Sequence, residues 1–204
     1  MSIIDQLRLN PRPICVANGI RTGPEAGSFV GTQQGGQCQI NEASDGTDVY
    51  TLTATAGAGT DYYFPWLQRS WTYVRVPQNV PNGTIVMTGG VNGCSLIVSD
   101  DHNDYVFYHD GDSKYLPVGS NKIVGNEIVR IVPADYDPND YTQTVFTSYL
   151  QSYKKAKLPM PSGDISYGNF VLFVKVNGQF DACATAVLSL GKPMALKGHY
   201  ILSF

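Results

Sequence analysis

The sequence predicts an α+β fold in a single domain: a β-sandwich-like core of mixed sheets with one main helix and several short peripheral helices. Three observations point to this class. The length of 204 residues suits one domain. The 21 glycines and 13 tyrosines, with only 15% charged residues, favour short strands and turns over a helical bundle. Strand-like runs are spread along the chain, whereas a single long segment has helical spacing.

The N-terminal quarter predicts one short helix, loops and a strand. Residues 1–9 fit a helix that ends before Pro11 and Pro13, because proline disrupts a helix interior. Glycine and small polar residues fill 18–48, which indicates loops around one strand. Alternating apolar and polar residues then predict a strand over 49–56.

The middle of the chain predicts a series of short strands. The aromatic-rich segment 60–76 is interrupted at Pro65, which cannot donate a ladder hydrogen bond. Trp66 fits either the lining of a cleft or the core, and the sequence leaves both open. The strands that we expect are 71–76, 83–89, 94–98, 105–109 and 127–132.

The main helix is expected over residues 138–157. Asp137 can cap it, and Pro138 suits the first helical position. Five apolar residues share one face at helical spacing. They are Val145, Phe146, Tyr149, Leu150 and Tyr153. Strands close the chain after this helix, and the pair Asn177-Gly178 between apolar runs predicts a tight hairpin.

Charge and cysteine spacing argue against several function classes. The net charge is −3 and no basic run is longer than Lys154-Lys155, so neither a nucleic acid nor an anionic membrane is an expected partner. The first residues do not form a Sec signal peptide, and export would need another route. The four cysteines include no Cys-x-x-Cys pair. We therefore expect no metal, no cofactor and reduced thiols.

The segment 94–109 places a cysteine and a histidine on one predicted hairpin. Residues 99–104 form a polar turn between two apolar runs. If Val98 faces Tyr105 across the hairpin, then Cys94 faces His109. Directly opposed side chains lie about 4.5–5.5 Å apart, which is close enough for an imidazole to activate a thiol. A one-residue shift in register would separate the pair.

The residues before Cys94 suit the remaining needs of acyl transfer. The loop "TGGVNGC" can approach a substrate closely, and backbone N–H groups near Asn92 and Gly93 are candidate oxyanion donors. The histidine also needs a partner that fixes its orientation. Thr88 is a candidate through its hydroxyl, and Asn92 or a backbone carbonyl are alternatives.

These residues resemble the bacterial glutamine deamidases of the cytotoxic necrotizing factor and Burkholderia lethal factor type. The family pattern is Leu-Ser-Gly-Cys with a histidine about a dozen or more residues later, and here Asn92, Gly93 and Cys94 end the matching tetrapeptide. His109 follows at a fitting distance, and Thr88 matches a threonine that lethal-factor-type members have before the cysteine. Asn92 departs from the usual serine.

The resemblance implies a cysteine-dependent protein glutamine deamidase that acts as a bacterial toxin or effector over one catalytic domain, residues 1–204. Cys94 would be the nucleophile, His109 the acid and base, and Thr88 the orienting group. The implied partner is a eukaryotic host protein with a reactive glutamine, such as a Rho-type GTPase or a translation initiation helicase. The protein would then work in the host cytoplasm after delivery by a bacterium, and we expect a monomer.

Two other functions stay open at this point. A cysteine protease or a transglutaminase-like acyl transferase would use the same Cys-His dyad. A non-catalytic binding module would keep Cys94 buried and inert, which is the ordinary state of a free cysteine. His102 belongs to the polar turn and is expected to be solvated, while His199 is expected at a strand end.

Overall fold

A computed structural model describes residues 1–46 and 48–204, and it confirms the α+β class with a core of two packed sheets, of which only the larger is mixed in the described residues. Thr47, in the segment predicted as loop, lies outside the described residues. The large sheet has the strand order β1-β3-β2-β4-β6-β10-β11-β12, in which β1–β3 and β4–β6 are parallel pairs. The small sheet has the order β5-β8-β7-β9 and is antiparallel.

In the middle of the chain, the observed strand bounds lie close to the predicted ones. The large sheet contains β1 (Gly19–Pro24), β2 (Gly36–Ser44), β3 (Val49–Ala56), β4 (Asp61–Tyr63), β6 (Ile85–Met87), β10 (Ile165–Val176), β11 (Gln179–Leu190) and β12 (Pro193–Ser203). The small sheet contains β5 (Trp71–Pro77), β7 (Ser95–Asp101), β8 (Asp104–Asp110) and β9 (Asn126–Ile131). The expectation of one strand in 18–48 was wrong, because β1 and β2 both lie there and form through pairing with the more distant β3.

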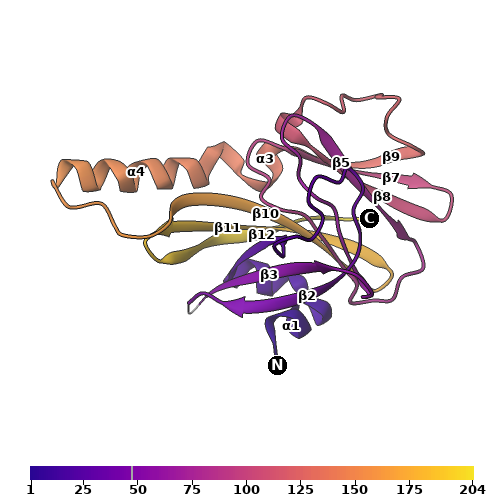
Figure 1. Cartoon of the computed structure of the whole chain (residues 1–204), viewed down its shortest axis with the longest axis horizontal. Helices are drawn as coiled ribbons and strands as arrows, with labels where there is room; N and C mark the ends of the chain where they lie inside the picture. Colours follow the sequence, from indigo (N-terminus) through magenta and orange to yellow (C-terminus); the bar gives the residue numbers. More distant parts are fainter. Residues whose placement is uncertain (47) are drawn as a thin grey trace.

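The main core lies between the two sheets. Phe173 and Val86 of the large sheet pack there with Phe107 and Leu96 of the small sheet. A second cluster, on the other face of the large sheet, joins Leu172 to the N-terminal helices. The molecule therefore has three layers: helices, large sheet and small sheet (Figure 1).

The N-terminal layer consists of two helices rather than the one that was expected. α1 (Ile3–Leu9) begins at a capping box of Ser2 and Asp5. α2 (Pro11–Ala17) begins at the proline that was expected to end helical structure. Proline is tolerated in a first helical turn, where its missing N–H has no intrahelical partner in any case.

The main helix begins later than expected. α3 (Pro133–Tyr136) is followed by a 3₁₀ turn, η2 (Pro138–Asp140), and then by α4 (Tyr141–Lys155). Asn139 and Asp140 have left-handed backbones with φ of 60° and 50°, so Pro138 starts the short turn and not the helix. The Asp137 carboxylate still accepts a hydrogen bond from the Thr142 backbone N–H, at 2.8 Å.

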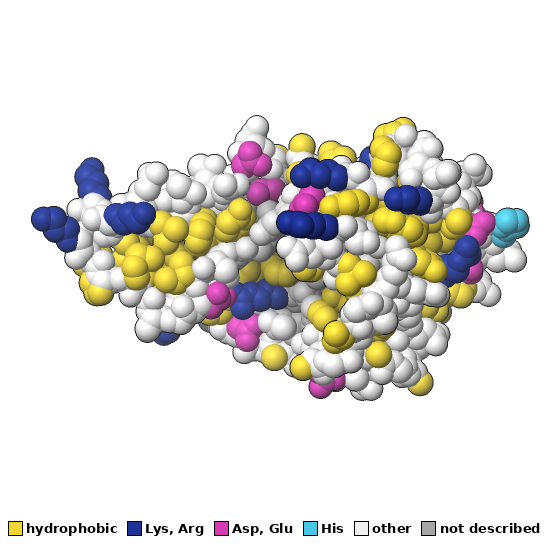
Figure 2. Space-filling view, turned by 45° about the horizontal axis from the view of Figure 1, so that its top comes forward, with side chains coloured by type: hydrophobic (Ala, Val, Ile, Leu, Met, Phe, Trp, Pro, Cys, Tyr) yellow, Lys and Arg dark blue, Asp and Glu magenta, His cyan; other side chains and the backbone are white. Residues whose placement is uncertain are grey.

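Helix α4 lies over the far ends of β10 and β11 and covers them loosely (Figure 1). Phe146 packs against Tyr167 of β10, with ring centroids 5.1 Å apart, in the usual aromatic range. The predicted apolar face is otherwise half-buried, and Tyr149 is exposed. Figure 2 shows hydrophobic side chains along this helical arm and basic side chains at its end. None of the described helices is long and apolar enough to cross a membrane.

The two central hairpins differ in how well their pairing was predicted. Asn177 and Gly178 form the expected tight turn, both with positive φ, and β10 pairs with β11 from Val176 to Gln179 outward. The β7–β8 register was wrong by two residues: His109 faces Leu96, and the turn is only His102 and Asn103.

The longer β7–β8 ladder is stabilised from the neighbouring strand. The Arg75 guanidinium of β5 contacts the Asp101 carboxylate at 2.7 Å and that of Asp104 at 3.4 Å, so these acidic residues remain in the strands. Because the shift is two residues, every side chain keeps its predicted face. Leu96 and Phe107 face the main core, while Ile97 and Val106 pack on the other side of the small sheet.

Candidate functional site

Thr88, Cys94 and His109 meet at one end of the main core. Thr88 directly follows β6, Cys94 directly precedes β7, and His109 is the second-last residue of β8. All three are buried, with exposed fractions of 0%, 3% and 1%. The loop from 88 to 94 crosses from the large sheet to the small one, which brings the three residues together.

His109 is held by Thr88 on one side of its ring. The Thr88 hydroxyl lies 2.8 Å from His109 Nδ1, so of the alternatives for an orienting group the structure places the threonine there. The edge of the ring faces Phe64, with centroids 6.4 Å apart. Burial lowers the pKa of His109 to about 3, and the imidazole is therefore neutral at physiological pH.

The other ring nitrogen of His109 is buried and unsatisfied. Among the described residues, Nε2 has no hydrogen-bond partner. Buried polar atoms in folded proteins nearly always have a partner, and the exceptions require an explanation. In the tautomer that carries its proton on Nδ1, this N–H donates to the Thr88 hydroxyl and the Nε2 lone pair is available to accept a proton.

Cys94 lies on the same face of the hairpin as His109, but not directly opposite it. In the observed register the position that would face Cys94 is 111, and His109 is one step along the same face. In a regular ladder such diagonal neighbours are about 7–8 Å apart. The Cys94 Sγ atom instead makes a weak contact with the Asn92 carbonyl oxygen, at 3.8 Å. The predicted direct opposition is therefore replaced by a diagonal one.

The environment of Cys94 acts on its pKa in two directions. Burial raises the pKa of the thiol, and it is the largest effect. The Asp112 and Asp110 carboxylates also raise this pKa, because negative charge disfavours the thiolate, whereas the Asp112 backbone N–H and the Trp66 indole N–H lower it. In the resting protein Cys94 and His109 are thus both neutral.

The loop before Cys94 is fixed to β10 by its own polar groups. The Asn92 side chain accepts a hydrogen bond from the Asn169 backbone N–H at 2.8 Å and donates one to the Tyr167 carbonyl at 3.2 Å. The Cys94 backbone N–H donates to the Val91 carbonyl at 2.8 Å. Gly93 has a φ of 77°, which glycine adopts without strain. The Asn92 amide and the Cys94 N–H are therefore engaged within the loop.

The Tyr136 hydroxyl holds this loop through two of its backbone carbonyls. It donates to the Cys94 carbonyl at 2.9 Å and also to the Val91 carbonyl. Tyr136 belongs to α3, a helix that the sequence did not predict. Its placement shows that the loop conformation depends on a residue more than forty positions away.

An open cleft of about 720 Å³ reaches Cys94 from the surface. Aromatic side chains form much of its lining: Phe29, Tyr63, Trp66, Tyr167 and Phe170. Asp112 is the one ionisable carboxylate, and no cation stands beside it, among the lining residues that the structure describes. Trp66 thus lines the cleft with half of its surface exposed. Phe29 and Phe170 were not predicted to line this cleft, because both lie far from Cys94 along the chain.

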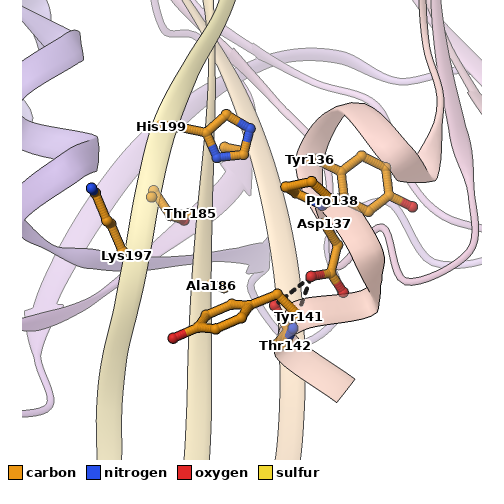
Figure 3. Close-up of a pocket in the computed structure, with 11 residues that line it drawn as sticks. Tyr136, Asp137, Pro138, Tyr141, Thr142, Thr185, Ala186, Lys197 and His199 are labelled. Carbon is orange, nitrogen blue, oxygen red and sulfur yellow. Dashed lines mark hydrogen bonds between the residues drawn. The ribbon is translucent and has the colours of Figure 1, made fainter. Parts of the chain in front are cut away.

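A smaller pocket lies between η2 and the strands β11 and β12 (Figure 3). Its volume is about 200 Å³, and Asp137 and His199 are among its lining residues. The Asp137 carboxylate is satisfied by Thr142 and Asn169, and His199 Nε2 lies 2.7 Å from the Asp135 carbonyl. These polar groups are used in joining the helices to the sheet. His199 lies inside β12 and not at the strand end where it was expected.

The remaining cysteines and His102 lie apart from the Cys94 cleft. Cys15, Cys38 and Cys183 are buried in the cluster beneath the N-terminal helices and are free thiols. His102 stands in the β7–β8 turn with its side chain 90% exposed. In the part of the chain that is described, His, Cys, Asp and Glu form no group of three with the geometry to hold a metal ion.

Comparison with known proteins gives partial matches. Residues 66–156 match the family described as the Mcf1 activator-binding domain. Among solved structures, the chain is similar to the C-terminal domain of CNFy from Yersinia pseudotuberculosis, with 9% identity and a TM-score of 0.30. That similarity covers 71% of this chain and 62% of the other. No curated protein sequence matches the chain.

Proposed function

We propose that the protein is a cysteine-dependent protein glutamine deamidase. One observation carries the proposal: a buried histidine, oriented by Thr88, leaves an unpartnered Nε2 on the same hairpin face as a cysteine that lines an open cleft. An inert core cysteine needs neither the cleft nor the oriented histidine. The resemblance of the segment ending in Cys94 to the glutamine deamidase motif supplies the reaction.

The first half of the reaction forms a thioester. The Cys94 sulfur attacks the carboxamide carbon of a glutamine side chain while His109 Nε2 accepts the thiol proton, and the carbonyl electron pair moves to oxygen. When that pair re-forms the C=O bond, the C–N bond breaks. The leaving nitrogen takes the proton from the imidazolium and departs as ammonia, which leaves the acyl group on Cys94.

The second half releases glutamate. Water adds to the thioester carbon while His109 accepts one of its protons. The tetrahedral intermediate then expels the Cys94 thiolate, which recovers a proton from the imidazolium. The net change is glutamine plus water to glutamate plus ammonia, and the enzyme returns to its neutral resting state.

The protonation states of Cys94 and His109 before substrate binds determine how this cycle starts. Burial keeps Cys94 as a thiol and His109 as a neutral imidazole, so the proton moves as the substrate engages and not beforehand. The side chains must approach for this step, and catalytic contacts often tighten only in the substrate complex. A neutral imidazole suits the task, because only the neutral form can accept a proton.

The substrate we propose is a glutamine on a loop of a host protein, reached in the host cytoplasm after bacterial delivery. The cleft is open and largely aromatic, which suits a neutral carboxamide with apolar neighbours. We propose one catalytic domain, acting as a monomer, with a Rho-type GTPase or a translation initiation helicase as examples of targets. A protease or transglutaminase-like enzyme would share the thioester, and its product would differ.

The experiment that tests this function is mass analysis of eukaryotic lysate proteins treated with wild-type protein or with Cys94→Ser. Deamidation adds about one dalton to a peptide and leaves the backbone intact, whereas proteolysis cuts it and transamidation adds an amine. We expect one or a few peptides to gain this mass with wild type only. Equal peptide masses in the two treatments would contradict the proposal.

A second candidate is binding of a partner protein without catalysis. The match of residues 66–156 to a family described as an activator-binding domain favours it, and this range includes α4 with exposed Tyr141 and Tyr149. A binding module would keep its biological effect in Cys94→Ser and lose it when Tyr149 is replaced by aspartate. A deamidase would respond in the opposite way to Cys94→Ser.

A further inference from the structure

The short turn η1 (Gly111–Ser113) is joined to the chain on both sides of Cys94. The Ser113 hydroxyl donates to the Gly93 carbonyl at 3.0 Å and accepts from the Ser95 hydroxyl at 2.7 Å. Because residues 93 and 95 flank the nucleophile proposed above, the turn is held beside the thiol, and its middle residue is held with it.

The turn is also packed closely against the segment that follows Trp66. The Gly111 N–H donates to the Ser70 carbonyl at 3.0 Å. A Cβ atom at Gly111 would lie 2.7 Å from the Ser70 carbonyl oxygen and 3.4 Å from that of Leu67, so a side chain has no room there. Asp112, the next residue, has a left-handed φ of 54°, which aspartate and asparagine adopt more readily than most residues. The turn therefore has a fixed place between the loop before the thiol and the Trp66 segment.

The two aspartates on either side of Gly111 differ in how their carboxylates are used. Asp110 is 1% exposed, and its carboxylate accepts a hydrogen bond from the Tyr115 N–H at 2.7 Å. Asp112 is exposed, lines the Cys94 cleft and takes part in none of the ion pairs that the described residues form. Asp110 thus stabilises the turn, whereas the Asp112 carboxylate is available to a ligand in the cleft.

The rest of the cleft lining leaves this negative charge uncompensated and adds an aromatic surface. Among the described lining residues none is lysine, arginine or histidine, and Asp112 is the one carboxylate. Trp66 lines the same cleft and is 48% exposed. A carboxylate attracts a cation by its charge, and the face of an indole ring attracts one through the ring electrons. The cleft therefore has the chemistry to accept a cationic side chain and to reject an anionic one.

We propose that the substrate carries an arginine or lysine side chain beside the reacting glutamine, and that Asp112 selects it. The inference rests on the proposed deamidase function and deepens it by naming the class of substrate segment. The Asp112 carboxylate attracts a cationic neighbour of the glutamine and repels an acidic one, so it acts on specificity through both. The stem of an arginine or lysine side chain is apolar, which suits the aromatic lining of the cleft.

Two alkylating reagents of opposite charge test this selection at Cys94 itself. They are iodoacetyl-glycyl-argininamide and iodoacetyl-glycyl-glutamic acid α-amide. In both, the thiolate forms a sulfur–carbon bond as iodide leaves with the electrons of the carbon–iodine bond. The iodoacetyl-glycyl unit is as long as a glutamine residue, so the charged side chain takes the place of the residue beside the glutamine. Both rates depend on the same thiolate, and their ratio therefore reports selection by charge and not thiol reactivity.

We expect wild type to react faster with the arginine reagent, as measured on the Cys94 peptide by mass spectrometry. Asp112→Asn should lower the arginine-to-glutamate rate ratio by about fivefold, the order of one exposed ion pair. Asparagine accepts a left-handed backbone, so the turn should be kept, and thermal unfolding verifies this. High salt should lower the wild-type ratio toward that of Asp112→Asn, because salt screens exposed charges.

Asp140→Asn is the matched control for Asp112→Asn. Asp140 is also an exposed aspartate with a left-handed backbone, at a φ of 50°. Its replacement changes the net charge by the same amount, and Asp140 does not line the cleft. Asp140→Asn should therefore keep the wild-type ratio.

The outcomes distinguish this inference from the function on which it rests. If plain iodoacetamide labels Cys94 equally fast in wild type and His109→Ala, the proposed deamidase site is wrong and the inference falls with it. If labelling depends on His109 but Asp112→Asn keeps the wild-type ratio, the substrate assignment alone is overturned. Equal falls in Asp112→Asn and Asp140→Asn would trace the preference to net charge and overturn it too. A fall in Asp112→Asn alone supports it.

Discussion

Cys38 and Cys94 are both buried thiols whose pKa is raised chiefly by burial, and yet only one of them lies in a reactive setting. Cys38 sits on β2 with no exposed surface, its pKa raised to about 12, and the nearby Asp61 carboxylate adds to the shift. Cys94 lines a cleft and shares a hairpin face with His109. Burial alone therefore does not separate a nucleophile from a core residue, and the neighbouring groups do.

The largest effect expected from this comparison is on activity. Cys94→Ser should lower the proposed glutamine deamidation by about 10³-fold or more, because the thiol is the proposed nucleophile and its loss would disable the whole unit. Cys38→Ser should keep the activity of the folded protein and lower its free energy of unfolding by about 1–3 kcal/mol, since it buries a hydroxyl without an assigned partner. Ammonia release and thermal unfolding measure the two effects. Equal activity losses in both variants would remove the distinction between the thiols.

The histidine is the feature that Cys38 lacks, so its removal should make Cys94 resemble Cys38. We expect His109→Ala to lower deamidation by about 10²–10⁴-fold, the range for loss of a general acid–base group. The double variant with Cys94→Ser should be no worse than Cys94→Ser alone, because the two residues act in one step. Additive losses in this double-mutant cycle would show that they act separately.

The buried His109 should also make the free energy of unfolding depend on pH. Its pKa is about 3 in the folded protein and about 6.5 when unfolded, so only the unfolded chain takes up the proton between these values. Stability is therefore full above pH 6.5 and falls by up to about 1.4 kcal/mol per pH unit on going down toward pH 3. Denaturant unfolding at several pH values measures the slope, and His109→Gln should flatten it. An unchanged slope in that variant would assign the effect to other groups.

The sequence predicted the parts of this molecule that depend on local chemistry. Asn177-Gly178 specifies a hairpin by itself, because both residues accept positive φ. The segment from Asp100 to Asp104 contains no comparable turn signal. The register of the β7–β8 pair there depends on Arg75 of a neighbouring strand. Counting residues therefore placed Cys94 and His109 on the right face and two positions out of register.

The details of the site depend on contacts between distant segments, and these were out of reach of sequence reasoning. Thr88 was a candidate because it precedes the cysteine closely, and it does contact His109. Tyr136 and Ser113, which fix the loop around Cys94, were not considered. The Asp-Gly-Asp-Ser run directly after His109 was a usable turn signal, but nothing local shows that it lies over the thiol.

The smallest effect that we expect comes from Thr88, which acts on the reaction only through His109. Thr88→Ala removes the contact to Nδ1 and leaves the ring free to turn, so the turnover number kcat should fall about tenfold with little change in KM. Thr88→Ser keeps a hydroxyl at that position and should restore most of the loss. If Thr88→Ser is as impaired as Thr88→Ala, then the methyl group and its packing matter, and the hydroxyl does not orient the histidine. Wild-type kcat in both variants would mean that burial alone holds His109 in place, as burial alone holds Cys38.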